Sequence, residues 1–197
     1  MKALAAILAL FLPLQALAGA QQYEPLAVSV QARLSSLVSD RAPASMNFKS
    51  SADAQRWLSE MDVRLERRMP DRKQRMELLR TVHYEALRAR LDPQLVLGII
   101  EVESGFRKYA VSAAGARGYM QVMPFWLKLI GQPKHNLFHM RTNLAYGCAI
   151  LRHYLDVEKG DYVRALGRYN GSLGKPEYPN LVLSAWKGRW KYDGPTA

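Results

Sequence analysis

The most informative segment of this chain for its fold is Asp92-Pro93-Gln94-Leu95-Val96-Leu97-Gly98-Ile99-Ile100-Glu101-Val102-Glu103-Ser104. Asp92 can act as an N-cap carboxylate and Pro93 suits the first helical position, so a helix is expected to begin here. From Leu95 to Val102 only Glu101 is polar. A helix without a broad polar face is buried nearly all round. The segment therefore predicts a helix enclosed within a globular domain.

Further helices are predicted on both sides of this segment. One runs over residues 51–69 and ends at Pro70, and Asp71 followed by Gln74 resembles a capping box that starts the next. Strand signals are almost absent, and the glycine-containing residues 104–119 indicate an irregular loop or a small hairpin. The predicted fold is mainly α, a single globular domain over residues 51–192 with at most a very small β element. The remaining predicted helices span about 121–130, 142–158, 161–169 and 176–190.

Composition excludes several classes of protein. The chain has 197 residues, of which 49% are hydrophobic, so it can bury a core and is not disordered throughout. Its one cysteine excludes a disulfide scaffold and a cysteine-rich zinc site. Cys148 lies on an apolar helical stripe and is expected to be buried. The glycine-rich phosphate-binding motifs are missing.

The first twenty residues resemble a signal peptide. Lys2 precedes an apolar run from Ala3 to Leu14, and small residues place a cleavage site after Ala18 or Ala20. The run is shorter than the about 20 residues that a membrane span needs, although a short membrane anchor is the alternative. We expect a soluble, exported protein in which residues 21–50 form an N-terminal extension or linker.

The chain is basic, with a net charge of +11 that falls to +10 when Lys2 is removed. Outside the cytoplasm, anionic cell-wall polymers or membrane surfaces are better candidate partners than nucleic acid. The alternative is that the charge serves solubility only.

Glu101 and Glu103 end the buried helix and are the first candidates for chemistry. Residues two apart differ by about 200° around a helix, so at most one of the two can point into a given cleft. The helix C-terminus and partial burial both raise a carboxyl pKa, as a general acid requires. The alternative is a structural glutamate in an ion pair. From Ser104 to Leu155 the sequence has no acid but seven Lys or Arg, which we expect at the rim of the site.

The chain contains four ordered blocks: Glu103-Ser104-Gly105-Phe106, residues 110–124 with Gly118-Tyr119-Met120-Gln121-Val122-Met123-Pro124, Asn143-Leu144-Ala145-Tyr146-Gly147, and Ala165-Leu166-Gly167-Arg168-Tyr169-Asn170-Gly171. In their order and spacing these blocks resemble the catalytic domain of the soluble lytic transglycosylases, relatives of goose-type lysozyme. The resemblance covers about residues 90–172 and implies a lysozyme-like fold. Tyr119 stands where the family usually has leucine and Ser172 where it has glycine.

The resemblance also implies roles for individual residues. Glu103 corresponds to the only catalytic carboxylate, and Ser104 helps to hold the sugar. Met120 and Gln121 line the glycan groove, while Tyr169 sits beside the acid with Asn170 next to it. Met120 and Tyr169 could instead be ordinary packed residues. No cofactor or metal is implied, and His135 and His139 lack the further ligands of a zinc site.

The resemblance implies a periplasmic enzyme that acts on peptidoglycan glycan strands. It would cleave the β-1,4 bond between N-acetylmuramic acid (MurNAc) and N-acetylglucosamine (GlcNAc) and leave a 1,6-anhydro end without adding water. We expect a monomer, with cell-wall or secretion-machinery proteins as candidate partners and no nucleic acid. Two alternatives remain: a hydrolytic goose-type-like muramidase, and a non-catalytic peptidoglycan-binding or secretion-associated domain.

Overall fold

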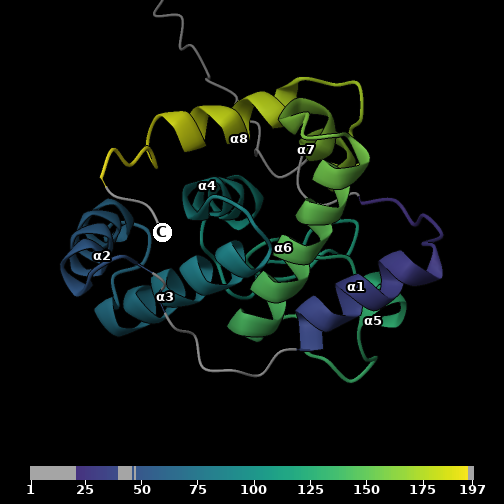
Figure 1. Cartoon of the computed structure of the whole chain (residues 1–197), viewed down its shortest axis with the longest axis horizontal. Helices are drawn as coiled ribbons and strands as arrows, with labels where there is room; N and C mark the ends of the chain where they lie inside the picture. The colour runs from purple at the N-terminus through teal and green to yellow at the C-terminus, as the bar shows by residue number, and fades with distance from the viewer. Residues whose placement is uncertain (1–20, 40–45, 47, 195–197) are drawn as a thin grey trace, which may run out of the picture.

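A computed structural model describes residues 21–39, 46 and 48–194, and these contain eight α-helices. The predicted signal peptide, with Ala18 and Ala20, lies outside the described residues. The mainly α prediction is confirmed, since the described residues form only isolated β-bridges, at Val111–Arg117 and Arg117–Val122. The helices are α1 (Val28–Ser39), α2 (Ser51–Leu65), α3 (Arg72–Arg88), α4 (Pro93–Ser104), α5 (Phe125–Ile130), α6 (Met140–Val157), α7 (Tyr162–Asn170) and α8 (Glu177–Lys187) (Figure 1).

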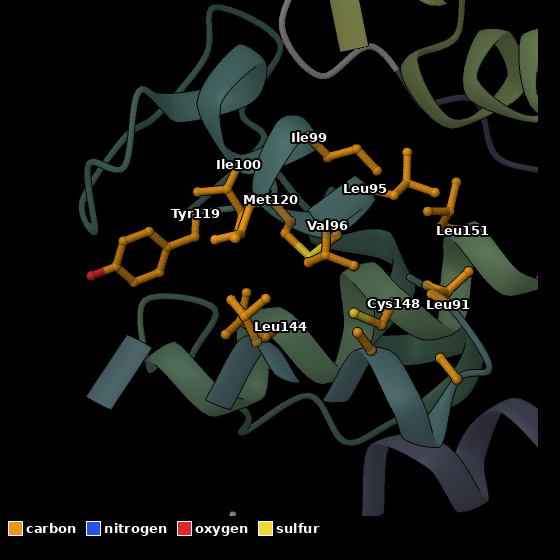
Figure 2. Close-up of a cluster of buried hydrophobic side chains, with 14 of the residues drawn as sticks. Leu91, Leu95, Val96, Ile99, Ile100, Tyr119, Met120, Leu144, Cys148 and Leu151 are labelled. Atoms are coloured by element: carbon orange, nitrogen blue, oxygen red, sulfur yellow. The ribbon is translucent and has the colours of Figure 1, made fainter. Parts of the chain in front are cut away.

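Helix α4 is the predicted buried helix and lies near the middle of the molecule, with α8 above it and α3 below it in Figure 1. Asp92 caps it by accepting a hydrogen bond from the backbone N–H of Gln94. The prediction of burial nearly all round is confirmed, because every residue from Gln94 to Ile100 is buried. Figure 2 shows its apolar side chains packed together with Leu144, Cys148 and Leu151 of α6. Cys148 is a free, buried thiol, as the sequence predicted.

Helices α4 and α8 pack very closely at Gly98. A Cβ atom at this position would lie 3.3 Å from the backbone nitrogen of Trp186 and 3.3 Å from the carbonyl oxygen of Val182. Glycine therefore allows the two helix backbones to approach. This contact matters for the site described below, because it holds the start of α8 beside the end of α4.

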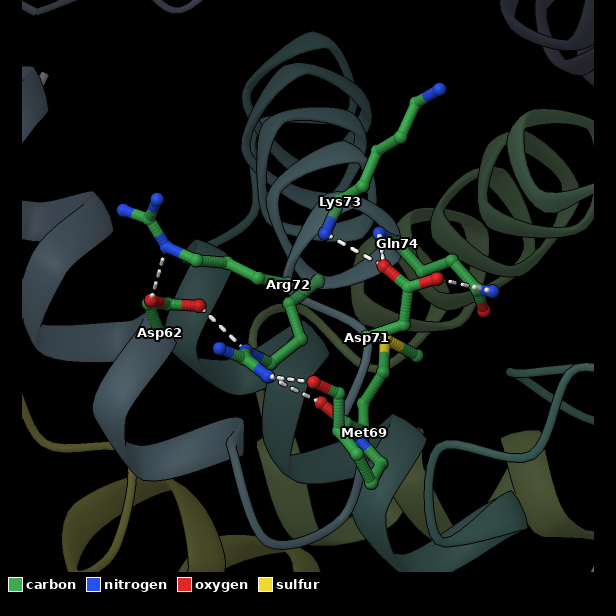
Figure 3. A network of polar contacts seen from close by, with 8 residues as sticks. Asp62, Met69, Asp71, Arg72, Lys73 and Gln74 are labelled. Atoms are coloured by element: carbon green, nitrogen blue, oxygen red, sulfur yellow. Dashed lines mark hydrogen bonds and ion pairs between the residues drawn. The ribbon is translucent and has the colours of Figure 1, made fainter.

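A polar network stabilises the junction between α2 and α3 (Figure 3). Asp71 caps α3 by accepting hydrogen bonds from the backbone N–H groups of Lys73 and Gln74, as the sequence predicted. Arg75 donates to the Asp62 carboxylate at 2.6 Å and to the backbone carbonyls of Met69 and Pro70. The Arg75 guanidinium lowers the pKa of Asp62. Helix α2 ends at Leu65, earlier than the predicted residue 69, because the chain turns before it reaches Pro70.

Within the segment 21–50, predicted as an N-terminal extension or linker, residues 28–39 form helix α1. This helix contacts α5 and α6, and it buries Leu34 and Val38 against them. Only two of its apolar side chains, Leu34 and Val38, are buried, and the sequence of the helix shows only weak helical periodicity. Tertiary packing supplies the stability that an isolated helix of this length lacks. No helix in the described part of the chain combines the length and the apolar character needed to cross a membrane.

Candidate active site

A pocket of about 550 Å³ opens where α4 ends and the following loop begins. Gly105 adopts a left-handed conformation (φ 57°) that ends the helix and turns the chain along the pocket. Among the described residues that line the pocket, Glu103 is the only acid. The lining consists of Val102, Glu103, Ser104, Gly105, Arg107, Lys108, Tyr109, Ala110, Val111, Ser112, Ala113 and Gln121.

The Glu103 side chain is almost completely buried, with 4% of its surface exposed. The Tyr178 hydroxyl donates a hydrogen bond of 2.6 Å to Glu103 Oε1. Glu103 Oε2 has no hydrogen-bond partner within the described part of the chain. The two carboxyl oxygens therefore have different environments, and Oε2 is the one left without a protein donor.

Burial raises the pKa of Glu103 to about 8, and the hydrogen bond from Tyr178 opposes this rise. Desolvation penalises the charged carboxylate, and in this pocket no ion pair to Glu103 among the described residues offsets the penalty. At neutral pH the group is largely a neutral carboxylic acid. It can therefore donate a proton to a bound molecule.

Glu101 is a structural glutamate held in ion pairs, which was the alternative considered for both Glu101 and Glu103. Its carboxylate accepts hydrogen bonds from Arg68, Arg189 and the Trp190 indole N–H, at 2.6–2.8 Å. It lies on a different side of α4 from Glu103 and does not line the pocket. The predicted separation of the two carboxylates is thus confirmed, and the ion pairs decide which one is available for chemistry.

Two of the seven Lys and Arg residues between Ser104 and Leu155 lie at this pocket. Arg107 and Lys108 line it, and Arg107 donates to the backbone carbonyl of Ser104 at 2.9 Å. Neither forms an ion pair with Glu103. They therefore lie at the rim, as expected, and leave the pKa of the acid elevated.

Asn143 of α6 holds the loop that carries Met120 and Gln121. It is fully buried, and its side-chain oxygen accepts from the Met120 backbone N–H at 2.7 Å. Its side-chain nitrogen donates to the carbonyls of Arg117 and Leu137. A Cβ atom at Gly118 would lie 2.5 Å from the Asn143 side chain, so only glycine fits there. Asn143 belongs to one of the four sequence blocks that resemble the family, but no role was predicted for it from the sequence.

Ser104 and Gln121 both line the pocket, but their polar groups form hydrogen bonds with the protein backbone. The Ser104 hydroxyl lies 2.8 Å from the Tyr119 carbonyl and 3.0 Å from the Ile100 carbonyl. The Gln121 side-chain N–H group donates to the carbonyls of Ala110 and Gly118. These bonds fix the shape of the loop that walls the pocket.

Met120 is not in the groove, which corrects the expectation from the resemblance. Its side chain is fully buried in the core shown in Figure 2, and a Cβ atom at Gly147 would lie 2.4 Å from its sulfur. The flexible thioether of Met120 packs inside the domain, in the space that the missing side chain of Gly147 leaves open. The backbone carbonyl of Met120 accepts a hydrogen bond of 2.7 Å from the Tyr169 hydroxyl.

The tyrosine that bonds the acid is Tyr178, whereas Tyr169 was expected there. Tyr169 is near enough for the Glu103 charge to raise the pKa of its phenol, with burial as the main cause. Asn170 donates to the Ser172 hydroxyl at 3.0 Å and does not line the pocket. Tyr178 was missed because it stands in the first turn of α8, outside every quoted motif, and 75 residues separate it from Glu103.

Among the residues described here, no cluster of three or more His, Cys, Asp or Glu side chains could hold a metal ion. His135 Nδ1 pairs with the Tyr146 hydroxyl at 2.8 Å, and His139 precedes α6 as its N-cap residue. The two histidines therefore do not share a helical face.

The fold and the site together define a helical domain with one buried carboxylic acid at an open polar pocket. Residues 80–178 match the Transglycosylase SLT domain, and the chain belongs to that family. This confirms the family resemblance and the mainly α, lysozyme-like fold.

Curated proteins are similar in sequence to part of this chain. The chain is 35% identical over 100 residues to a transglycosylase of Enterobacteria phage PRD1, and the matched region covers 47% of this chain and 37% of the phage protein. It is 46% identical over 70 residues to membrane-bound lytic murein transglycosylase C of Histophilus somni (31% of this chain, 19% of the relative). The corresponding protein of Mannheimia succiniciproducens is 37% identical over 97 residues (45% and 26%). The chain thus matches well under two thirds of each relative's length. No solved structure matches it.

Proposed function

We propose that this protein is a peptidoglycan lytic transglycosylase that cleaves the MurNAc-β-1,4-GlcNAc bond without hydrolysis. The family membership and the names of the relatives support the substrate and the reaction class. The observation that carries the proposal is Glu103, a buried and protonated acid that is the only acidic residue lining its pocket in the described chain.

One carboxylic acid can catalyse the reaction in two steps. Glu103 first donates its proton from Oε2 to the glycosidic oxygen, and the bond from that oxygen to C1 of muramic acid breaks. The N-acetyl oxygen of the same sugar bonds to C1 in place of an enzymic nucleophile, as in substrate-assisted glycosidases. The Glu103 carboxylate then accepts the proton of the sugar's 6-hydroxyl while O6 displaces the N-acetyl oxygen at C1. The acid is regenerated, and the product has a 1,6-anhydro ring.

The pocket favours ring closure over attack by water. A second carboxylate that could hold a water molecule about 6.5–9.5 Å away, as inverting enzymes require, is not among the described lining residues. The 6-hydroxyl is tethered to the reacting sugar, and well-oriented intramolecular groups reach effective molarities of about 10⁵ M or more. Tyr178 orients the Glu103 carboxyl for both proton transfers through its hydrogen bond.

We further infer that the protein is exported through the signal-like segment 1–20 and works as a monomer in the periplasm. The signal-like sequence of that segment supports export, and the proposed substrate, a polymer of the cell wall, supports the periplasmic location. Without Lys2 the exported chain has a net charge of +10, which suits binding to anionic wall polymers. Other wall or secretion proteins are candidate partners.

Mass spectrometry of products from purified cell walls tests the reaction. We expect muropeptides that end in anhydro-muramic acid, carry no added water and resist borohydride reduction. Products that gain one water for each cut and are reduced by borohydride would indicate a hydrolytic muramidase. Absence of any cleavage would indicate a binding domain.

A further inference from the structure

A second polar pocket of about 520 Å³ lies beside the catalytic one, between α3 and the start of α6. The two pockets share Lys108 and Tyr109, which form the wall between them. Tyr109 is 71% exposed on this wall. A molecule bound beside Glu103 can therefore extend into the second pocket by passing these two residues.

Tyr119 is the most buried polar group of the second pocket. Its side chain is only 1% exposed, and Figure 2 shows its hydroxyl pointing away from the apolar cluster. The hydroxyl makes no hydrogen bond with another described residue, while the charge of Glu77 acts on it. The hydroxyl therefore opens into the second pocket, where a bound molecule can form a hydrogen bond with it.

Side chains of both charge signs line the same pocket as the Tyr119 hydroxyl. Glu77 comes from α3 and Lys108 from the loop after α4, and the imidazole ring of His139 stands just before α6. Arg141 also lines the pocket, where it pairs with the buried carboxylate of Glu85 at 3.0 Å. A neutral sugar ring gains little from such an array, whereas a peptide with both carboxylates and a free amine complements it.

We propose that this second pocket binds the peptide stem of peptidoglycan and that Tyr119 and Glu77 determine preference for glycan that carries stems. The inference rests on the proposed function. Stem peptides are covalently attached to muramic acid, so a muramic acid held beside Glu103 must direct its stem past the edge of the catalytic pocket. The wall formed by Lys108 and Tyr109 is the edge that the two pockets share.

The test compares two substrates for each protein: soluble glycan strands with intact stems, and the same strands after an amidase has removed the stems. We expect Tyr119→Phe and Glu77→Gln to lower kcat/KM on intact strands about tenfold more than on stem-free strands, since hydrogen bonds to charged groups have about this effect. Glu66→Gln and Tyr162→Phe are matched controls, because both side chains are exposed and line neither pocket. Thermal melting checks that each variant is folded.

Two results separate this inference from the proposed function. Equal losses on the two substrates, or no loss on either, would overturn the assignment of the second pocket and leave the proposed function intact. A wild-type chain that cuts neither substrate would overturn the proposed function and this inference with it.

Discussion

The Tyr178 hydroxyl donates a 2.6 Å hydrogen bond to Oε1 of Glu103, joining the first turn of α8 to the last turn of α4. Both side chains are buried, with 1% and 4% of their surfaces exposed. Because Oε1 is occupied as an acceptor, the acidic proton is held at Oε2. The packing of the two helices therefore leaves Oε2 as the carboxyl oxygen without a hydrogen-bond donor among the described residues.

Replacing Glu103 with glutamine removes the proton donor and keeps the size of the side chain. General acid–base groups contribute about 10²–10⁴-fold to rate. We expect Glu103→Gln to lose cell-wall cleavage by at least this factor in a turbidity assay, while circular dichroism shows an unchanged fold.

Glu101→Gln is the matched control, two residues away on the same helix. It should keep most of the activity, because Glu101 does not line the pocket. Its ion pairs with Arg68 and Arg189 are partly exposed, so we expect a stability loss of about 1 kcal/mol or less. An inactive Glu101→Gln beside an active Glu103→Gln would reverse the assignment.

The raised pKa of Glu103 makes the wild-type protein less stable at alkaline pH. The folded protein holds the proton up to about pH 8, whereas the unfolded chain releases it near pH 4.5. Stability from this group is therefore fully present below pH 4.5 and is lost as pH rises toward 8. Glu103→Gln lacks this loss, so its stability should exceed that of the wild type by up to about 5 kcal/mol at pH 8.

Urea unfolding of both proteins between pH 4.5 and 9 measures this difference. The gap should widen steadily with pH and level off above the pKa of Glu103. A constant gap across the range would mean that Glu103 has an ordinary pKa in the folded protein.

Tyr178→Phe should alter the pH profile as well as the rate. The Tyr178 hydrogen bond lowers the pKa of Glu103, so its removal raises this pKa further above 8. The alkaline limb of kcat/KM should shift upward, and kcat should fall because the carboxyl is no longer oriented. A pH–rate series on soluble glycan strands measures both effects.

Tyr169→Phe is the comparison for Tyr178→Phe, since each variant removes one buried hydroxyl. The Tyr169 hydroxyl bonds to the Met120 carbonyl, and its loss leaves that buried carbonyl without this donor. We expect a stability loss of about 1–3 kcal/mol and an alkaline limb close to that of the wild type. An equal shift of the alkaline limb in both variants would contradict the separate roles of the two tyrosines.

Asn143→Ala should loosen the loop that walls the pocket. It removes the three hydrogen bonds to Met120, Arg117 and Leu137, all from a fully buried side chain. We expect a stability loss on the order of 3 kcal/mol together with reduced activity.

Asn136→Ala removes one exposed hydrogen bond, to the backbone N–H of Phe138, and should cost about 0.5 kcal/mol. Denaturant unfolding compares it directly with Asn143→Ala. Similar losses in the two variants would show that Asn143 does not hold the loop.

The helical domain and its central helix could be predicted from local sequence because their signals lie within single segments. The apolar run from Leu95 to Ile100, with Asp92 and Pro93 before it, specifies a buried helix by itself. Helix α1 was missed because most of its stability comes from contacts with α5 and α6.

The sequence alone determined that at most one of Glu101 and Glu103 could enter a cleft, because two positions along a helix turn the side chains to opposite faces. It also determined that the next fifty residues carry no second acid. The choice of Glu103 follows from helix packing, since Arg68 and Arg189 form ion pairs with Glu101. Tertiary packing also brought Tyr178 to the acid and turned Met120 into the core. Such contacts depend on how distant helices pack, and no local pattern encodes them.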